Sequence, residues 1–514
     1  MTPRVGVYNR YWRSQGGGER FSGMIAQVLA ERATVELVSH DDLDVAALGA
    51  HLGLDLTRCA VRVVPDAGDG VLSEITGEYD LLVNGSYMSA LPSQARRALY
   101  VCYFPTPADH DLTAWRRYLV RAIGPLARRG APIIGPMYGI GWFPPEGGRV
   151  RRYAWTSGDA KLHFHPGPEF ELAFDLARVG AGPADLVVTM DGVELLATTA
   201  GSTFVRHRVG VPGATEPRTV HFRSPTFIPA PPDQRRLGVA VSGLRVVGSG
   251  WQPRERLRNR FPWLLRDPRD TSHLSSYDAV VGVSQYTVDW IEQLWGCPAE
   301  VLYPPIQVEQ FHPVTERTRE IVSAGRFFAP GGGHSKRQLE QVQTFATIVR
   351  SGRLADWTLH LIGGCEPAQR GYLDQVHAAA TGLPVEIHAN APRDLLEDLL
   401  SRASIQWSAT GFGENDAKTP WASEHFGMTT VEAMAGGCVP IVIDKAGQRE
   451  IVRDGVDGYR WSTLEELMRR TMQVAGDDGL RARLASSARE RAQLYSDAAF
   501  ADNIRDLVKR HDLL

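Results

Sequence analysis

Strand-like and helix-like segments alternate along both ends of this 514-residue chain, and this alternation constrains the fold more than any other feature. It predicts parallel sheets covered by helices. Near the N-terminus the apolar runs are VGVYN (5–9), TVELVSH (34–40), YDLLVNG (79–85) and ALYVCYF (98–104). Toward the C-terminus they are EIVSAG (320–325), WTLHLIG (357–363), VEIHA (385–389), IQWSA (405–409) and VPIVI (439–443). The GGG of QGGGER (15–20) predicts a turn into a helix over 20–31.

The middle of the chain follows a different pattern. From about Gly147 to Gly248 the apolar residues recur at every second position, and helical periodicity is almost lacking. The pair Asp191-Gly192 inside this region is a hairpin signal. We therefore expect an all-β module, a sandwich of about one hundred residues. Strand and helix patterns return in YDAVVGVSQYTVDWIEQLWG (277–296) and AEVLYPPI (299–306), so the module is inserted into the first α/β unit.

The composition excludes several classes of protein. Hydrophobic residues make up 43% and charged residues 22% of the chain, as in soluble globular proteins. The formal net charge of -3 provides no basic excess of the kind that nucleic-acid binding requires, so no nucleic-acid partner is expected. Five widely spaced cysteines without a C-x-x-C pair argue against disulfides and structural zinc and favour a reducing, cytoplasmic compartment. No stretch predicts a signal peptide or a membrane span, so any membrane contact would be peripheral.

The segment SEHFGMTTVEAMAGGCVP (Ser423–Pro440) concentrates the chemistry. It predicts a helix from about Thr430 to Ala435, whose free amides and dipole favour a phosphate. Glu424 and Glu432 would repel a phosphate but can each accept two hydrogen bonds from a vicinal diol, so together they predict a nucleotide sugar. Thr429-x-x-Glu432 is also a capping box, and the sequence leaves both interpretations of Glu432 open.

Cations that could balance a diphosphate follow the first strand of the second unit. In SAGRFFAPGGGHSKRQ, residues Arg326, Lys336 and Arg337 lie beyond the carboxyl end of strand 320–325, where open α/β sheets bind ligands. A guanidinium fork and a lysine point charge suit two bridging phosphates. Solvated loop charges are the other interpretation.

These motifs carry a resemblance. SAGR with a following lysine, and EHFGMTTVEAMAGGCVPIV about a hundred residues later, resemble glycosyltransferase family 4, retaining enzymes of the GT-B fold. The N-terminal GGGER turn, VGVSQYT and VLYPPI are similar to that family's first domain. The resemblance covers roughly 1–140 and 250–490 and leaves the β module outside.

The resemblance implies an α/β architecture with two Rossmann-like domains facing a cleft. The N-terminal domain would comprise 1–145 and 250–312, with the all-β sandwich at 146–249 inserted in it. The C-terminal donor-binding domain would be 313–490, and a helix at 491–514 would cross back to the N-terminal domain.

The resemblance also implies roles for single residues. Arg326 and Lys336 would hold the diphosphate and stabilise the leaving group. Glu424 would bind hydroxyls of the donor sugar near the reacting carbon, and Glu432 would bind the ribose diol. The remaining donor contacts would be the backbone of Phe426, Gly427, Met428 and Thr429 and the close-approach glycines Gly17 and Gly18. Neither a metal nor a cofactor is implied; a GDP- or UDP-sugar is the co-substrate.

The chain departs from the family pattern in two places. Nine residues separate Arg326 from Lys336, a longer spacing than usual, so Arg337 could replace Lys336. The family histidine near the sugar corresponds to Cys102, and His110 in the next loop could take over its contact with sugar or acceptor. A further motif, DDLD (41–44), resembles a metal-binding signature of another glycosyltransferase fold but is better explained as a helix cap.

Acceptor and partners are predicted less sharply. Basic and aromatic residues gather in 114–129 and 251–266, and such helices can lie on anionic lipid, which would suit a lipid-linked acceptor at the inner face of the cell membrane. A glycan or a small-molecule hydroxyl is an alternative acceptor. The β module could bind a glycan, mediate a homo-oligomer or brace the N-terminal domain. The rival functions are a glycosyl phosphorylase of the same fold and a catalytically silent glycan-binding scaffold.

Overall fold

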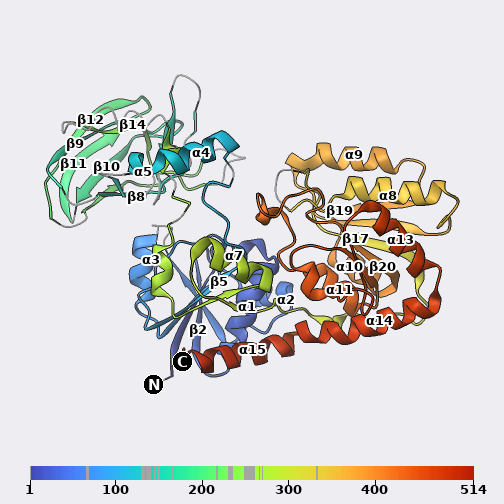
Figure 1. The fold of residues 1–514 in the computed structure, drawn as a ribbon. Helices are drawn as coiled ribbons and strands as arrows, with labels where there is room; N and C mark the ends of the chain where they lie inside the picture. Colours follow the sequence, from blue (N-terminus) through green and yellow to red (C-terminus); the bar gives the residue numbers. More distant parts are fainter. Residues whose placement is uncertain are drawn as a thin grey trace.

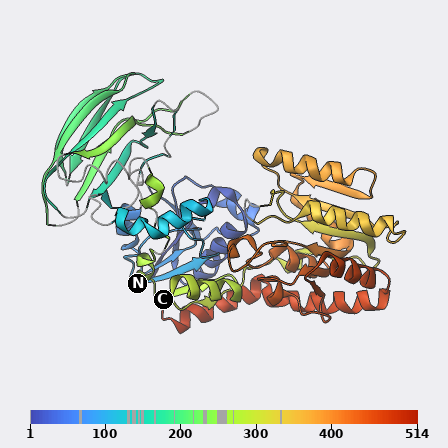
Figure 2. The same cartoon turned by 45° about the horizontal axis from the view of Figure 1, so that its top comes forward.

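The computed structural model contains three separate sheet regions (Figure 1). It describes residues 2–514 except 65–68, 111, 129–132, 135–140, 144–145, 148–150, 165–166, 191, 216–217, 230–234, 248–260, 266, 269 and 331–333. Two regions are parallel α/β sheets, and the third is a pair of antiparallel sheets that lies apart from them at the upper left of Figures 1 and 2. This is the predicted fold class.

The N-terminal region is a seven-stranded parallel sheet in the order β16-β15-β5-β4-β1-β2-β3. Its strands are β1 (Arg4–Tyr8), β2 (Thr34–Ser39), β3 (Cys59–Val63), β4 (Leu81–Asn84), β5 (Arg97–Cys102), β15 (Ala279–Gly282) and β16 (Glu300–Val301). Its helices include α1 (Gly17–Leu29), α2 (Val45–Leu52), α3 (Asp69–Thr76), α4 (Ala114–Ala122), α5 (Gly124–Arg128) and α7 (Gln285–Trp295). The last two strands of the sheet come from the chain that follows the antiparallel sheets, as expected for an insertion.

The inserted region is a β-sandwich. Five strands in the order β11-β10-β13-β8-β6 face four in the order β12-β9-β14-β7. The bounds are β6 (Ile133–Ile134), β7 (Tyr153–Trp155), β8 (Asp159–Phe164), β9 (Phe170–Ala177), β10 (Ala184–Met190), β11 (Val193–Ala200), β12 (Val205–Val211), β13 (Arg218–Arg223) and β14 (Ala240–Val247). Alternate residues point inward, so Phe164, Phe174 and Phe222 from both sheets form one core. The strands β10 and β11 pair as a hairpin, although Asp191 of its predicted turn lies outside the described residues.

The C-terminal region is a six-stranded parallel sheet in the order β19-β18-β17-β20-β21-β22. The strands are β17 (Thr318–Ala324), β18 (Thr358–Gly363), β19 (Val385–Ala389), β20 (Ala403–Ser408), β21 (Val439–Ile443) and β22 (Tyr459–Trp461). The helices are α8 (Gln338–Arg350), α9 (Arg370–Ala380), α10 (Arg393–Arg402), α11 (Met428–Ala435), α12 (Gln448–Ile451), α13 (Leu464–Ala475), α14 (Asp478–Ala492) and α15 (Asp497–Arg510). The central strands β20 and β21 are buried along their whole length, because helices cover both faces.

The two α/β regions are joined by a buried pair of rings and by hydrogen bonds. Helix α15 leaves the C-terminal region and lies against α1, where Phe500 packs edge-on against Phe21 (Figure 1). At the start of α15, Asp497 accepts a 2.6 Å hydrogen bond from Arg20 of α1. Between the two sheets, the carboxylate of Glu450 in α12 accepts bonds from the first backbone amides of α7. These hydrogen bonds hold the N-terminal ends of α1 and α7 against the C-terminal region.

Some local predictions were wrong. Helix α1 begins at Gly17, not at residue 20, because Glu19 accepts a bond from the Gly16 amide and closes the first turn there. The strand predicted over 299–306 is only Glu300–Val301, since two consecutive prolines that lack amide donors follow. The edge strands β3 and β22 were missed, because β3 is only partly buried and contains Arg62, and β22 has only three residues. Within the described residues, no helix is both long and apolar enough to cross a bilayer.

Candidate functional site

The short helix α11 presents its N-terminus at the centre of the molecule. Its cap, Gly427, has a φ of 119°, and a Cβ there would lie 2.7 Å from Nε2 of Gln448, so only glycine fits. The following amides of Met428 and Thr429 occupy the first turn, where no helical carbonyl is available to them. Partial positive charge therefore gathers at this point, which is suited to an anion.

Beside this turn, Glu424 meets Lys336. The Lys336 ammonium donates to Oε2 of Glu424, and the Thr410 hydroxyl donates to the same oxygen at 3.1 Å. The lysine stem lies on Gly325, directly after β17, because a Cβ on that glycine would come within 2.6 Å of it. Burial alone would raise the pKa of the Glu424 carboxyl, but the charge of Lys336 and the hydrogen bonds from Lys336 and Thr410 bring it below its usual range. Glu424 is therefore an anion held by a cation at the end of a strand.

The other two cations of the loop differ in their surroundings. Arg326 is exposed, and its guanidinium lies 4.8 Å from the centre of the Phe328 ring. In the described part of the chain no carboxylate pairs with Arg326. Arg337, by contrast, is buried and binds Glu340 at 3.1 Å and Glu414 at 2.6 Å. Lys336, and not Arg337, therefore stands next to Glu424.

Glu432 does not cap its helix. Gly427 is the cap residue, and Thr429 makes no capping bond, so the capping-box interpretation is wrong. Oε1 of Glu432 instead accepts a 2.7 Å bond from Arg393, the first residue of α10. Its buried Oε2 has no hydrogen-bond partner among the described residues. A buried carboxylate oxygen left in this way is available to a hydroxyl of a ligand.

The N-terminal region closes the site from the opposite side. A Cβ on Gly17 would lie 2.8 Å from Sδ of Met428, so the first turn of α1 directly faces the first turn of α11. A Cβ on Gly18 would lie 3.3 Å from the Tyr103 ring, whose hydroxyl donates to the Gly18 carbonyl at 2.8 Å. The glycine-rich start of α1 thus allows two helix N-termini to approach each other across the boundary.

Two histidines that were not predicted as site residues line the same boundary. His425 stacks on Phe104, from the loop after β5, with ring centres 4.1 Å apart, and it meets the His334 ring edge-on at 4.4 Å. Nδ1 of His334 lies 3.1 Å from the Ser423 carbonyl. Burial lowers the pKa of His425 well below its usual value and also lowers that of His334, so both rings are neutral at pH 7. The only sequence signal was the position of His425 next to Glu424.

Cys102 and His110, the predicted sugar contacts on the N-terminal side, have different surroundings. Cys102 is 3% exposed and packs with Tyr100 and Ile291 behind β5, and burial raises the pKa of its thiol well above the usual value. Because Cys102 has the same strand parity as Tyr100, it faces the core, and we remove it from the site. His110 lies in a turn, where its Nδ1 is 3.1 Å from the Pro107 carbonyl.

The C-terminal sheet also brings together three possible metal ligands. His360 on β18 lies beside Glu386 and His388 on β19, which follow it by 26 and 28 positions in the sequence. The DDLD motif is a helix cap as expected, since Asp44 accepts a 3.0 Å bond from the Ala47 amide at the start of α2.

Two α/β sheets joined at a boundary, with two helix N-termini face to face, define a protein of the GT-B fold. Residues 309–491, which include all but the last helix of the C-terminal region, match the family described as "Glycosyl transferases group 1". This confirms the resemblance drawn from the sequence.

Curated relatives extend the comparison. A protein of Xenopus laevis named GDP-Man:Man(3)GlcNAc(2)-PP-Dol alpha-1,2-mannosyltransferase is 29% identical over 212 residues, which are 36% of this chain and 40% of that protein. Proteins with the same name from Dictyostelium discoideum and human are 25% identical over 258 residues and 26% identical over 249 residues. These matches cover 46% and 44% of this chain and 48% and 47% of those proteins, so the chain spans less than half of the length of these relatives.

Solved structures support the fold. The crystal structure of Anabaena HepE in complex with UDP-glucose has a TM-score of 0.53 at 12% identity and covers 99% of this chain and 100% of that one. Sucrose-phosphate synthase from Thermosynechococcus elongatus has a TM-score of 0.52 at 12% identity and covers 99% of this chain and 98% of that one. At 12% sequence identity, this similarity supports the fold and carries no information on substrate.

Proposed function

We propose that this protein is a retaining glycosyltransferase that moves a hexose from a nucleotide diphosphate sugar to an acceptor hydroxyl. The observation that carries the proposal is the pair of Lys336 and Glu424 beside the free amides of α11, opposite Gly17. The pair combines a cation and helix amides for a diphosphate with a carboxylate for sugar hydroxyls. Few other ligand classes need all three at one place.

In the proposed complex the diphosphate lies between the cations and the first turn of α11. Lys336 and Arg326 stabilise the charge that develops on the leaving phosphate as the bond from sugar carbon to phosphate oxygen breaks. The acceptor oxygen bonds to the same face of that carbon, and its proton passes to the leaving phosphate oxygen. Glu424, which already accepts two bonds, orients the donor sugar and need not act as the base.

Glu432 binds the ribose of the donor in this proposal. Its unpartnered Oε2 supports the role, since a buried oxygen of this kind gains most from a hydroxyl donor. The loop after β19 would meet the base: Oδ1 of Asn390 accepts a 2.8 Å bond from the Cys365 amide and joins two loops at the same edge. Replacing Glu432 with alanine should weaken nucleotide binding while a sugar phosphate without ribose binds as before.

The sugar is proposed to be mannose and the nucleotide GDP. The relatives quoted above carry GDP-Man and mannosyltransferase in their names, which makes GDP-mannose the first donor to test. UDP-glucose is the comparator, because HepE was crystallised with it.

The acceptor is proposed to be a lipid-linked glycan at the cytoplasmic face of a membrane. Helix α4 supports this, because Trp115 and Tyr118 are 57% and 71% exposed on a helix that also carries arginines. The Arg117 guanidinium lies 5.8 Å from the ring of Trp421, which precedes Glu424 by three residues. A basic, aromatic helix of this kind can lie on anionic lipid and bring an acceptor to the site. Most of the second basic segment, 251–266, lies outside the described residues.

The test compares donors by thermal shift and by transfer. GDP-mannose at 100 times its dissociation constant adds about 2.7 kcal/mol to the folded state, and radiolabelled mannose should reach lipid extracts only with an intact Glu424. Retention is read from the anomeric configuration of the product. A phosphorylase would instead need inorganic phosphate for turnover. A scaffold would bind glycan without any turnover, and either result would refute the proposal.

A further inference from the structure

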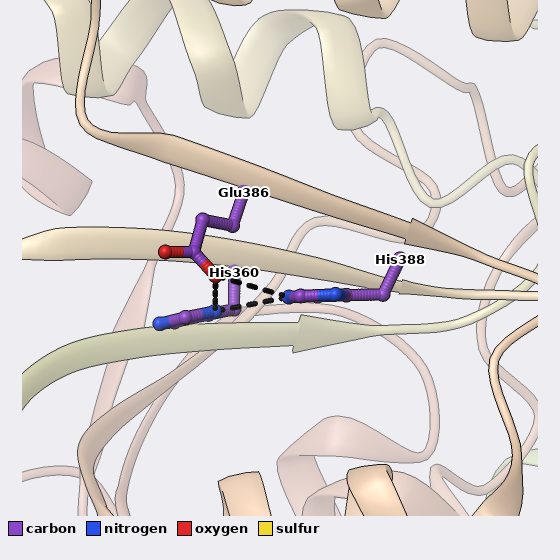
Figure 3. Close-up of side chains that lie close together, drawn as sticks. All are labelled: His360, Glu386 and His388. Atoms are coloured by element: carbon purple, nitrogen blue, oxygen red, sulfur yellow. Dashed lines mark hydrogen bonds and ion pairs between the residues drawn. The ribbon is translucent and has the colours of Figure 1, made fainter.

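A second cluster of side chains, which could bind a metal ion, lies at the edge of the C-terminal sheet. The parallel pairing of β18 with β19 places His360 opposite Glu386 and Ile362 opposite His388. Because side chains alternate along a strand, all three polar residues project from the same face. Figure 3 shows the two imidazole rings nearly end to end, with the Glu386 carboxylate above the His360 ring and joined by dashed lines to both rings.

The three facing atoms have the spacing of metal ligands. Nδ1 of His360 lies 3.1 Å from Nε2 of His388, and Oε2 of Glu386 lies 3.5 and 3.6 Å from these nitrogens. A point equidistant from the three atoms is about 2.0 Å from each, which is the bond length of Zn²⁺ to histidine nitrogen and carboxylate oxygen. A single ion could therefore bond all three without moving the strands.

The surroundings of His360 add a second, independent observation. Its other nitrogen, Nε2, is buried, makes no hydrogen bond within the described residues and lies 3.4 Å from Oε1 of Glu320 on β17. Glu320 is itself held by Arg402 at 2.6 Å and by the Thr318 hydroxyl at 2.7 Å. A carboxylate behind a histidine is the usual outer partner of a metal ligand, because it fixes the tautomer that leaves the opposite nitrogen free to bond.

We propose that His360, Glu386 and His388 bind one divalent transition-metal ion, with Zn²⁺ as the best fit. Two imidazoles and one carboxylate are ligands that zinc accepts, and three protein ligands leave a fourth position for water. Glu386 is 60% exposed, so the ion can enter from solvent. Without an ion, one ring N–H donates to the other ring nitrogen, and the ion replaces that proton.

The bound ion would clip the edge strand β19 to its neighbour β18. The loop that follows β19 leads within four residues to Arg393, which holds Glu432. The ion would thus stiffen the supporting frame of that loop and take no part in glycosyl transfer. This site stands independently of the proposed function.

Metal-free, untagged protein titrated with zinc chloride tests the proposal. We expect one ion per chain by equilibrium dialysis with elemental analysis, and proton release on binding. Cobalt should give the intense visible absorption of a four-coordinate site. Loss of an outer partner of a metal ligand lowers metal affinity by roughly 10–100-fold, and Glu320→Gln should lower zinc affinity by an amount within this range. His388→Gln and Glu386→Gln each remove a ligand and should lower zinc affinity by more than this.

His377→Gln is the matched control, because His377 is exposed on the neighbouring helix α9. It should leave affinity and stoichiometry unchanged. Both Glu386 and His388 are at least partly exposed, so their variants should fold, which circular dichroism would verify. The proposal is overturned if the parent protein shows no saturable binding at micromolar zinc. It is equally overturned if the double variant of Glu386 and His388 binds as well as the parent.

Discussion

Replacement of Glu424 by glutamine is the sharpest test of the proposed site. The change keeps the shape of the side chain and one acceptor oxygen but removes the charge that faces Lys336. The carboxylate is 16% exposed and the ammonium 19% exposed, so water cannot fully replace their interaction. We expect the folded protein to survive and glycosyl transfer to collapse.

The magnitudes follow from these contacts. A hydrogen bond to a charged group contributes about 1.5–3 kcal/mol, and glutamine retains part of it, so the free energy of unfolding should fall by about 1 kcal/mol. For a unit of the size of the C-terminal region, this lowers Tm by about 2–4 °C. Loss of a preorganised polar group at the reacting centre typically lowers kcat by roughly 100- to 1,000-fold.

The chain offers a close control in Glu414. This carboxylate also accepts from one cation and one threonine hydroxyl, Arg337 at 2.6 Å and Thr419 at 3.2 Å, and it is 22% exposed. Glu414→Gln should therefore lower Tm by a similar amount while kcat stays within about threefold, since a stability loss of this size leaves the protein folded.

Transfer of mannose from GDP-mannose, or from the donor that the thermal-shift screen selects, is the assay for both variants. Tm is recorded on the same preparations. The reasoning is refuted if Glu424→Gln transfers at the rate of the parent, or if both variants lose activity in proportion to their loss of stability.

Three further outcomes follow from the structure. Because burial lowers the pKa of His425, only the unfolded chain takes up a proton on this side chain near pH 6.5, and the free energy of unfolding falls as the pH drops below that value. His425→Gln should therefore reduce the pH dependence of the free energy of unfolding, measured with urea between pH 7.5 and 5.5, by up to about 1.4 kcal/mol per pH unit. An unchanged pH dependence would contradict this role of His425. A Cβ on Gly17 would meet the flexible end of the Met428 side chain, so Gly17→Val should displace that side chain at the first turn of α11 and lower kcat/KM at least about tenfold. Gly182→Val, with open space at its Cβ, should behave as the parent. Trp115→Ser on α4 should reduce co-sedimentation with anionic vesicles, while Val193→Ser, 64% exposed on β11, should not; equal effects would remove α4 as the lipid contact.

The sequence by itself determined the architecture. Period-two and helical patterns are local, so the two parallel sheets, the inserted sandwich and the strands β19 and β21 could be predicted to within a residue or two. It also pointed to the loop of Glu424 and to Lys336, because glycine, charge and strand end lie close together along the chain. The edge strands β3 and β22 were missed because neither contains a long apolar run, and the start of α1 was missed because a side chain, Glu19, closes its first turn.

Only the tertiary structure decided which side chains meet. Glu424 and Lys336 are 88 positions apart in the sequence. Lys336 pairs with Glu424 while the neighbouring Arg337 pairs with Glu414, and only the folded loops determine this choice. The stacking of His425 on Phe104 joins two different sheets, and the ligand triangle at His360 depends on β18 lying beside β19. Strand order and side-chain direction come from burial and pairing over the whole chain, and no local pattern encodes them.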